Sequence, residues 1–339
     1  MSCLCSIIPK DVLERFARDR SLSAAERKSF ADAAQFEDAW RRLRTAHGKL
    51  AASAGAMLAA GAVTTAPPAV LVYDCQHGTT VPGGPAAPGD VIAKRVAAET
   101  TAVADFYQKV FGRNSVDDAG KSLLSSIHFS VDYNNAFWNG NQMVYGDGDG
   151  KIFVDFTRAN DVIGHELTHG VTQFTAQFAY TNEAGGLNES ISDVFGSMFR
   201  QWRANQTAAR ADWLIGREIM GPSAIAKGYT CLRDMANPAA KHCLAPQPAH
   251  YSKVKPGMDP HYSSGIPNLA FCVAAKAIGG KSWEKAGKIW YAALTGYAPQ
   301  PNMKMKAFAN RTRTLAKSMF AAEPAVLAAI DKAWIGVGL

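Results

Sequence analysis

The stretch His165-Glu166-Leu167-Thr168-His169 decides which fold and chemistry we expect of this 339-residue chain. On a helix, residues four apart lie on one face, so His165 and His169 present two imidazoles side by side. Two imidazoles at this spacing are typical ligands of one Zn²⁺, and Glu166 beside them is a candidate general base. A pattern this short also arises by chance, so the rest of the chain has to supply a third ligand and its supporting groups.

Acidic residues in a second predicted helix supply the rest of such a site. The segment Gly185 to Asp193 opens this helix, and Glu189 and Asp193 lie one turn apart on the same face. Glu189 completes a His₂Glu ligand set for one Zn²⁺ per chain and leaves a fourth position for water, as in catalytic zinc sites. Asp193 is placed to accept the outer N–H of a ligand histidine. An ordinary acidic helix start is the alternative, but it does not explain why both acids face the same way.

Composition places the chain among soluble globular proteins. The residues are 47% hydrophobic and 19% charged, and the length suffices for two domains. The net charge is +7, but the lysines and arginines are scattered, so we expect no nucleic-acid partner. The Ala/Gly-rich stretch 50–72 is interrupted by Pro67-Pro68 and is too weakly apolar to span a membrane. We therefore expect no membrane partner. We also expect a monomer.

The amino terminus and the cysteines bear on cellular location. Residues 1–10 lack the basic start and the long apolar run of a secretory signal. The six cysteines are too few for a disulfide framework, so reduced thiols are expected, although Cys231 and Cys243 are placed to close a small loop. No Sec export route is therefore visible in this sequence.

The first half of the chain is predicted to change from helices to strands. Residues 10–50 read as helices, and the small residues and prolines of 51–69 read as a flexible linker. A short strand is predicted over 70–73, and Asp90 is placed to cap a helix that runs to about residue 110.

Strands are predicted between residues 127 and 156. Apolar residues alternate over 127–131, and the runs 143–145 and 152–154 flank the glycine-rich turn 146–150, which favours a hairpin over a calcium loop. Asn160 is a good cap for the helix that carries the His-Glu motif, and the pattern after it is mostly helical.

These motifs together resemble the thermolysin family of zinc metallopeptidases. The resemblance runs from about Val72 to the carboxyl terminus and is carried by the segments 134–140, 143–150, 164–171, 186–193 and 263–268. The start, Cys5 to Pro9 followed by Val12-Leu13, is similar to the compact pro-segment of the protealysin-like subgroup. The resemblance implies an α+β fold with a β-rich N-terminal lobe, a mainly helical C-terminal lobe and the active-site helix between them. The expected divisions are 1–60 for pro-segment and linker, 61–175 and 176–339.

The resemblance also implies roles for single residues. Glu166 would be the general base acting on a zinc-activated water, and His261 and Tyr180 would stabilise the oxyanion. In the family an aspartate five residues before this histidine orients it; here Pro256 stands there, and Asp259 is the nearest candidate.

Substrate contacts follow from the same resemblance. Asn135, the carbonyl of Ala136 and Arg233 match groups that hold the peptide backbone. The pocket for the residue after the cut is entirely apolar, which predicts cleavage on the N-terminal side of bulky hydrophobic residues; it maps onto Phe153, Phe156, Val162, Ile215 and Leu232.

The paired calcium site of the family is expected to be lost. Asp161 and Asp212 remain, whereas Arg200, Leu214 and Arg217 stand where three acids would be. Arginines cannot ligate Ca²⁺, and Arg200 is placed to form an ion pair with Asp161 instead.

The sequence therefore predicts a zinc-dependent neutral endopeptidase that acts on peptides or proteins and is made as a zymogen. Its own pro-segment is the expected internal partner, with self-cleavage within about residues 45–69. Cys3 or Cys5 could ligate the zinc and silence the zymogen, but we favour incidental thiols.

Two rival functions are an aminopeptidase with the same metal triad and a catalytically inactive zinc protein that binds a partner. An aminopeptidase needs acidic groups that bind a free α-amine, and we find no motif for them in the sequence. The inactive zinc protein is disfavoured because the sequence retains Glu166, His261, Tyr180 and Arg233. The family is usually extracellular, so secretion by a non-classical route and retention inside the cell both stay open.

Overall fold

The computed structural model describes residues 5–54 and 66–339. In this part of the chain, the main sheet has the strand order β1-β5-β6-β4-β2-β3 and mixes parallel with antiparallel pairs. Its strands are β1 (Cys5–Ser6), β2 (Val70–Asp74), β3 (Gly84–Pro85), β4 (Leu123–Ile127), β5 (Ala136–Trp138) and β6 (Met143–Tyr145). A small second sheet pairs β7 (Leu214–Ile215) with β8 (Arg233–Asp234).

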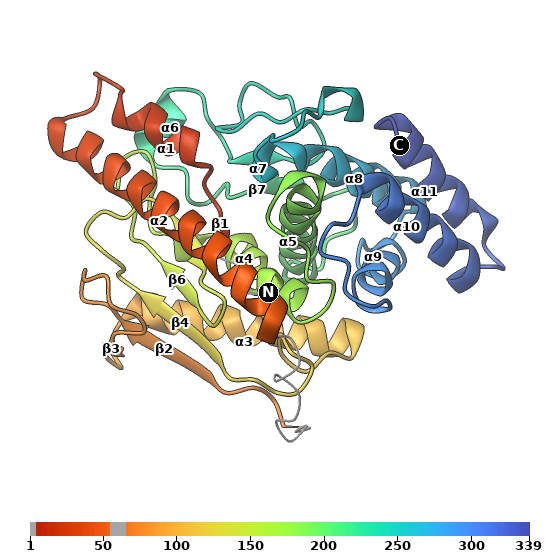
Figure 1. Cartoon of the computed structure of the whole chain (residues 1–339), viewed down its shortest axis with the longest axis horizontal. Coiled ribbons are helices and arrows are strands. Elements are labelled where there is room, and N and C mark those ends of the chain that lie inside the picture. The colour runs from red at the N-terminus through yellow and green to blue at the C-terminus, as the bar shows by residue number, and fades with distance from the viewer. Residues whose placement is uncertain (1–4, 55–65) are drawn as a thin grey trace.

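Helices cover the sheet and make up most of the C-terminal half (Figure 1). They are α1 (Lys10–Ala17), α2 (Ala24–Ala54), α3 (Val91–Phe111), α4 (Asn160–Gln173), α5 (Asn182–Arg203), α6 (Pro222–Ala226), α7 (Pro260–Ser263), α8 (Gly265–Ile278), α9 (Ala286–Thr295), α10 (Met305–Met319) and α11 (Pro324–Gly336), with 3₁₀ turns η1 (Phe156–Arg158) and η2 (Tyr251–Lys253). The predicted fold class, a β-rich N-terminal lobe with a helical C-terminal lobe, is confirmed. Among the described residues, no helix has the length and apolar character needed to cross a membrane.

Helix α3 begins and ends as its sequence predicts. The Asp90 side chain accepts a hydrogen bond from the backbone N–H of Ala93 at 2.8 Å, which caps the helix. Gly112 follows the last residue with a φ of +71°, a left-handed conformation that glycine adopts without strain. Figure 1 shows α3 running along one face of the sheet, where it contacts β2 and β4.

Helices α4 and α5 pack with their backbones close together because glycines lie at the crossing. A Cβ on Gly196 would lie 2.5 Å from the backbone oxygen of Asp161, and one on Gly164 would lie 3.1 Å from the Cα of Gly196. This close approach brings the His-Glu motif of α4 beside the acidic residues of α5. Helix α4 starts at Asn160 with Ala159 as its cap, so the predicted cap is wrong by one residue.

Two of the predicted strand segments are wrong. Strand β4 ends at Ile127 because His128, Ser130 and Asp132 have φ values of +51°, +55° and +49°, which turn the chain. Residues 152–154 form no hairpin with 143–145, since β6 pairs with β4 and β5 instead. One carboxylate oxygen of Asp149 accepts hydrogen bonds from the three backbone N–H groups of residues 151–153, which closes a compact loop.

The N-terminal segment contacts both lobes. Helix α1 lies on the C-terminal lobe, where Tyr262 donates a hydrogen bond to Asp11 at 2.5 Å and Arg15 donates to the Leu244 carbonyl at 3.0 Å. Helix α2 continues to Ala54, so the predicted linker start at residue 51 is too early. Residues 55–65 of that linker, and much of the predicted cleavage region, lie outside the described residues.

Aromatic side chains of α2 attach this segment to the N-terminal lobe. The ring of Phe36 lies 5.6 Å from that of Phe129 and 5.9 Å from that of Tyr133. The ring of Phe30 lies 6.3 Å from that of Phe153. The segment thus joins the two lobes across the region where the His-Glu motif lies (Figure 1).

Candidate active site

The three predicted metal ligands meet at one buried point. The Nε2 atoms of His165 and His169 are 3.0 Å apart, and each lies 3.5 Å from an oxygen of Glu189. Ligand atoms at about 2.0–2.1 Å from a tetrahedral Zn²⁺ are separated by about 3.3 Å, so the observed spacing fits this ion. The site therefore has the donor set and the size for zinc.

The outer nitrogens of both histidines are held as N–H donors. The Nδ1 of His165 donates to Asp193 at 2.9 Å, and the Nδ1 of His169 donates to the amide oxygen of Asn188 at 2.9 Å. The two Nε2 lone pairs consequently face each other, an arrangement that a cation between them stabilises. Burial and the neighbouring His165 hold the pKa of His169 well below its usual range, which keeps the ligand form neutral.

Asp193 connects the metal ligands to the substrate groove. Arg233 donates to both of its carboxylate oxygens at 2.9 and 2.7 Å, and the side-chain amide of Asn268 donates at 2.8 Å. Burial acts to raise the pKa of Asp193, but Arg233 and His165 outweigh it and hold this pKa well below its usual range. Asp193 therefore stays a carboxylate that can only accept the proton of His165.

Glu166 is a buried carboxylate that lacks a protein partner in the described part of the chain. Neither of its oxygens has a hydrogen-bond partner there, although the residue is fully buried. Burial and the charge of Glu189 raise the pKa of Glu166 well above its usual range. Buried polar atoms in native proteins are normally satisfied, so an orphaned carboxylate beside a metal donor set fits a group that acts on water.

His261 and Tyr180 both lie beside Glu189. The Tyr180 hydroxyl donates to Glu189 at 2.5 Å and lies 3.1 Å from the Nε2 of His261. The Nδ1 of His261 donates to Asp259 at 2.7 Å, so this aspartate reaches the ring across Pro260. Although burial acts to lower it, the charges of Glu189 and Asp259 raise the pKa of His261 to about 9.

The N-terminal segment occupies the predicted backbone-binding groups of the N-terminal lobe. Strand β1 pairs antiparallel with β5. Beyond it, the Ile7 N–H donates to the Ala136 carbonyl at 3.0 Å, and the Ile8 N–H donates to the Asn135 side chain at 3.0 Å. Sequence reasoning did not foresee this pairing.

The same short segment also occupies the groups of the C-terminal lobe. Arg233 donates to the Ile7 carbonyl at 2.9 Å, and the Nε2 of His261 donates to the Ser6 carbonyl at 2.6 Å. Ser6 and Ile7 are almost completely buried. The predicted backbone-binding groups of Asn135, Ala136 and Arg233, together with His261, are therefore all in contact with residues 6–8.

The residues predicted to form the apolar pocket are all buried. Rings of the N-terminal segment lie close to one of them, since those of Phe16 and Phe30 are 6.5 and 6.3 Å from that of Phe153. Its members are Phe153, Phe156, Val162, Ile215 and Leu232, each at most 1% exposed.

Cys5 lies at the edge of the metal ligands. Its sulfur, a ring nitrogen of His169 and an oxygen of Glu189 all lie within 4.8 Å of one another. Cys5 is disulfide-bonded, so the expectation of reduced thiols is wrong for this residue. The expectation is confirmed for four free cysteines, Cys75, Cys231, Cys243 and Cys272, whereas Cys3 lies outside the described residues.

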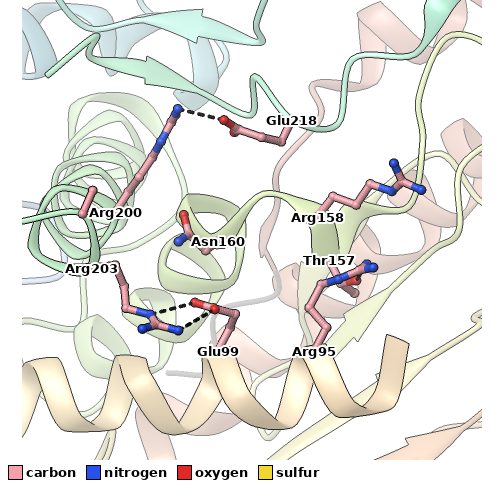
Figure 2. Close-up of a pocket in the computed structure, with 9 residues that line it drawn as sticks. Arg95, Glu99, Thr157, Arg158, Asn160, Arg200, Arg203 and Glu218 are labelled. Carbon is pink, nitrogen blue, oxygen red and sulfur yellow. Dashed lines mark hydrogen bonds and ion pairs between the residues drawn. The ribbon is translucent and has the colours of Figure 1, made fainter. Parts of the chain in front are cut away.

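The region where the family's calcium acids would lie contains arginines instead. Arg200 lies 3.5 Å from Asp161, which confirms the predicted ion pair, and it also contacts Asp212 at 3.2 Å and Glu218 at 2.8 Å. Figure 2 shows Arg200 at the edge of a cavity of about 430 Å³. Charged side chains from α3 and α5 line this cavity, among them Arg95, Glu99 and Arg203.

Sequence reasoning missed two asparagines of the site. Asn188 orients His169, and Asn268 donates to Asp193. Both lie inside the segments that carry the family resemblance, at 186–193 and 263–268. The family resemblance therefore already covered both positions, but neither asparagine has a helical spacing that would have marked it as part of the site.

A His₂Glu donor set with a buried glutamate beside it is characteristic of zinc metallopeptidases. Sequence models of the thermolysin metallopeptidase catalytic domain and alpha-helical domain match residues 89–173 and 176–339. The chain belongs to the thermolysin family, and it is a metalloendopeptidase.

Relatives place the chain near the protealysin-like members. It is 40% identical to an extracellular metalloprotease of Pectobacterium carotovorum subsp. carotovorum over 79% of this chain and 80% of that protein. It is 39% identical to thermolysin of Alicyclobacillus acidocaldarius subsp. acidocaldarius over 67% of this chain and 43% of that protein. The structure of the precursor of protealysin, a metalloproteinase from Serratia proteamaculans, superposes with a TM-score of 0.83 at 35% identity, covering 98% of this chain and 99% of that one.

Proposed function

We propose that this chain is a zinc-dependent neutral endopeptidase that cuts on the N-terminal side of bulky hydrophobic residues and is made as a zymogen. The single observation that carries the catalytic part is the meeting of His165, His169 and Glu189 beside the unpartnered Glu166. These three ligands would hold the metal and leave one position for the reacting groups.

The chain's own residues have distinct tasks in peptide hydrolysis. Bound zinc supplies a Lewis acid that polarises the scissile carbonyl and makes water more acidic. Glu166 takes the proton of the attacking water and passes it to the leaving amine. His261 and Tyr180, which lie 3.1 Å apart, donate to the carbonyl oxygen as negative charge develops on it.

Substrate selection follows from the groove. Asn135, the Ala136 carbonyl and Arg233 already hold a stretch of backbone in this structure, that of residues 7 and 8. A peptide that makes the same contacts would present the side chain after the cut to the buried apolar pocket around Phe153. We therefore expect Leu or Phe to be strongly preferred over Asp at that position, and equal cleavage before Leu and Asp in a peptide library would contradict this.

The zymogen proposal rests on the same contacts. Because residues 6–8 use the groups that a substrate needs, no substrate can bind until the segment leaves. The similarity to a protealysin precursor over almost the whole chain supports a pro-segment here. Cleavage within about residues 45–69 is the proposed first step of maturation.

The central test is the hydrolysis of casein by the Glu166→Ala variant of the mature enzyme. General-base catalysis contributes roughly 10²- to 10⁴-fold, so we expect a loss of at least that size with zinc content unchanged. Glu284→Ala, on an exposed position, is the matched control and should keep full activity. Undiminished hydrolysis by the Glu166 variant would refute the proposal, and cleavage of N-terminally blocked peptides separates the endopeptidase from an aminopeptidase.

Secretion and calcium independence complete the proposal. An extracellular relative supports secretion, and mass spectrometry of the protein's amino terminus from cells and from medium would test both location and processing. Arg200 fills the region of the calcium acids, so we propose that the double calcium site is absent.

A further inference from the structure

We propose that Cys231, His242 and Cys243 form a second Zn²⁺ site, separate from the catalytic centre. Ligand atoms of these three side chains all lie within 4.8 Å of one another. Two sulfurs and an imidazole nitrogen are a donor set that favours zinc over calcium or magnesium.

The distance between the two sulfurs matches a metal better than a covalent bond. The Sγ atoms of Cys231 and Cys243 are 3.8 Å apart, and both thiols are free. Two sulfurs bound at about 2.3 Å to a tetrahedral Zn²⁺ are also about 3.8 Å apart. A disulfide bond would need a separation of about 2.05 Å.

The backbone holds the two cysteines facing each other. Cys231 and Cys243 pair in an isolated parallel bridge. The Leu244 N–H donates to the Cys231 carbonyl at 2.9 Å, and the Thr230 N–H donates to the His242 carbonyl at 3.0 Å. The ligand side chains therefore project from two segments whose register is set before any metal binds, which lowers the cost of ordering them.

Asp234 restricts the orientation of the histidine. Its Oδ2 lies 3.3 Å from the Nε2 of His242, while its Oδ1 accepts hydrogen bonds from the N–H groups of Ala236 and Asn237 at 2.8 and 3.0 Å. A carboxylate behind a ligand histidine is a common support of zinc sites. The His242 side chain is 40% exposed, so the cluster has an entry path from solvent.

Zinc binds cysteine in its thiolate form, so both thiols would be deprotonated in the metal-bound site. Each thiol that binds the metal releases its proton to solvent, and no oxidant or reductant is needed.

This site would support the substrate groove from behind. Leu232 and Arg233 lie between Cys231 and Asp234, and Leu232 belongs to the apolar pocket while Arg233 contacts Asp193. A metal that joins residues 231 and 243 would hold in place the backbone segment that carries Leu232 and Arg233. The proposed role of this site is therefore one of positioning.

Zinc stoichiometry of the full chain tests the proposal, with Glu166→Ala as background to prevent self-cleavage. We expect about two zinc ions per chain, about one in His242→Ala or His169→Ala, and none when both are combined. His250→Ala, another exposed histidine, is the matched control and should keep both ions. If only the proposed catalytic site failed, His169→Ala would leave the count unchanged while His242→Ala still lowered it.

Cobalt substitution gives a second readout that does not depend on activity. Thiolate bound to Co²⁺ produces a charge-transfer absorption in the near ultraviolet, and Cys243→Ser should abolish it. The measurement uses a Cys5→Ala background because Cys5 lies near the catalytic ligands. An unchanged zinc count in His242→Ala, an absorption that survives Cys243→Ser, or a Cys231–Cys243 disulfide in the peptide map of the isolated protein would each overturn the proposal.

Discussion

Replacing Phe30 by alanine should loosen the pro-segment without disturbing the catalytic lobes. Phe30 is fully buried, and its ring lies 5.0 Å from that of Phe16 and 6.3 Å from that of Phe153. Truncating a buried phenylalanine costs roughly 3–5 kcal/mol. Since 1.4 kcal/mol is a factor of ten, the population of molecules with an undocked segment should rise roughly 100- to 4,000-fold.

Hydrogen exchange measured by mass spectrometry reports this population directly. Amides that exchange through local opening do so in proportion to the open fraction, so peptides from α1 and from α2 should lose protection by the same factor. Peptides from α5 and α8 should keep theirs. The full chain carries Glu166→Ala to prevent self-cleavage, and Gln35→Ala, exposed on the same helix, is the matched control.

Two results would refute the reasoning about this segment. Unchanged protection of α1 and α2 would mean that the Phe30 contact does not hold the segment. An equal loss of protection over the whole chain would mean that the segment and the lobes unfold as one unit.

The remaining predictions concern the helix crossing, pH and metal ions. Gly196→Ala should lower the free energy of unfolding by roughly 1–3 kcal/mol, because its Cβ would meet a backbone oxygen of α4 at 2.5 Å. Gly336→Ala has free space around its Cβ and should stabilise the protein. Thermal melts should therefore show a lower melting temperature for the first variant and a higher one for the second. Burial acts to lower the pKa of His128, but Asp147 and Asp90 outweigh it and raise this pKa. The ion pairs of protonated His128 with these two aspartates therefore stabilise the fold fully below about pH 6.5, and this stabilisation is lost as pH rises through the raised pKa. His128→Asn should therefore flatten the dependence of the melting temperature on pH above about pH 6.5, and an unaltered profile would contradict the ion pairs. Chelation of zinc should abolish casein hydrolysis, and added zinc should restore it. Added Ca²⁺ should leave the melting temperature unchanged, and a calcium-dependent rise localised to α4 and α5 by hydrogen exchange would count against the loss of the double site.

Local periodicity explains which parts of the site could be predicted. His165 and His169 are one helical turn apart, and so are Glu189 and Asp193. These residues could therefore be predicted from local spacing without knowledge of the fold. The cap at Asp90 is equally local. The contact of Asp259 with His261 was only a candidate, because it depends on the path of the chain around Pro260.

Long-range pairing explains what could not be predicted. The contact of Ile8 with Asn135 joins residues 127 positions apart in the sequence, and no local pattern in either segment predicts it. The turn at 128–132 was hidden as well, since alternating apolar residues favour a strand while the backbone adopts positive φ at three positions. Residues such as His128 tolerate that conformation only because their surroundings fix it.

The division of the N-terminal segment between the two lobes bears on how the proposed inhibition would end. While the chain is intact, its covalent continuity keeps the segment at a high effective concentration beside the two lobes. Cutting the linker breaks no contact of Tyr262 with Asp11 or of Phe36 with Phe129, so the segment would stay bound at first. Release then becomes a bimolecular equilibrium that responds to dilution. A crowded compartment would keep the cleaved enzyme silent, and export into a large volume would itself act as the activating signal.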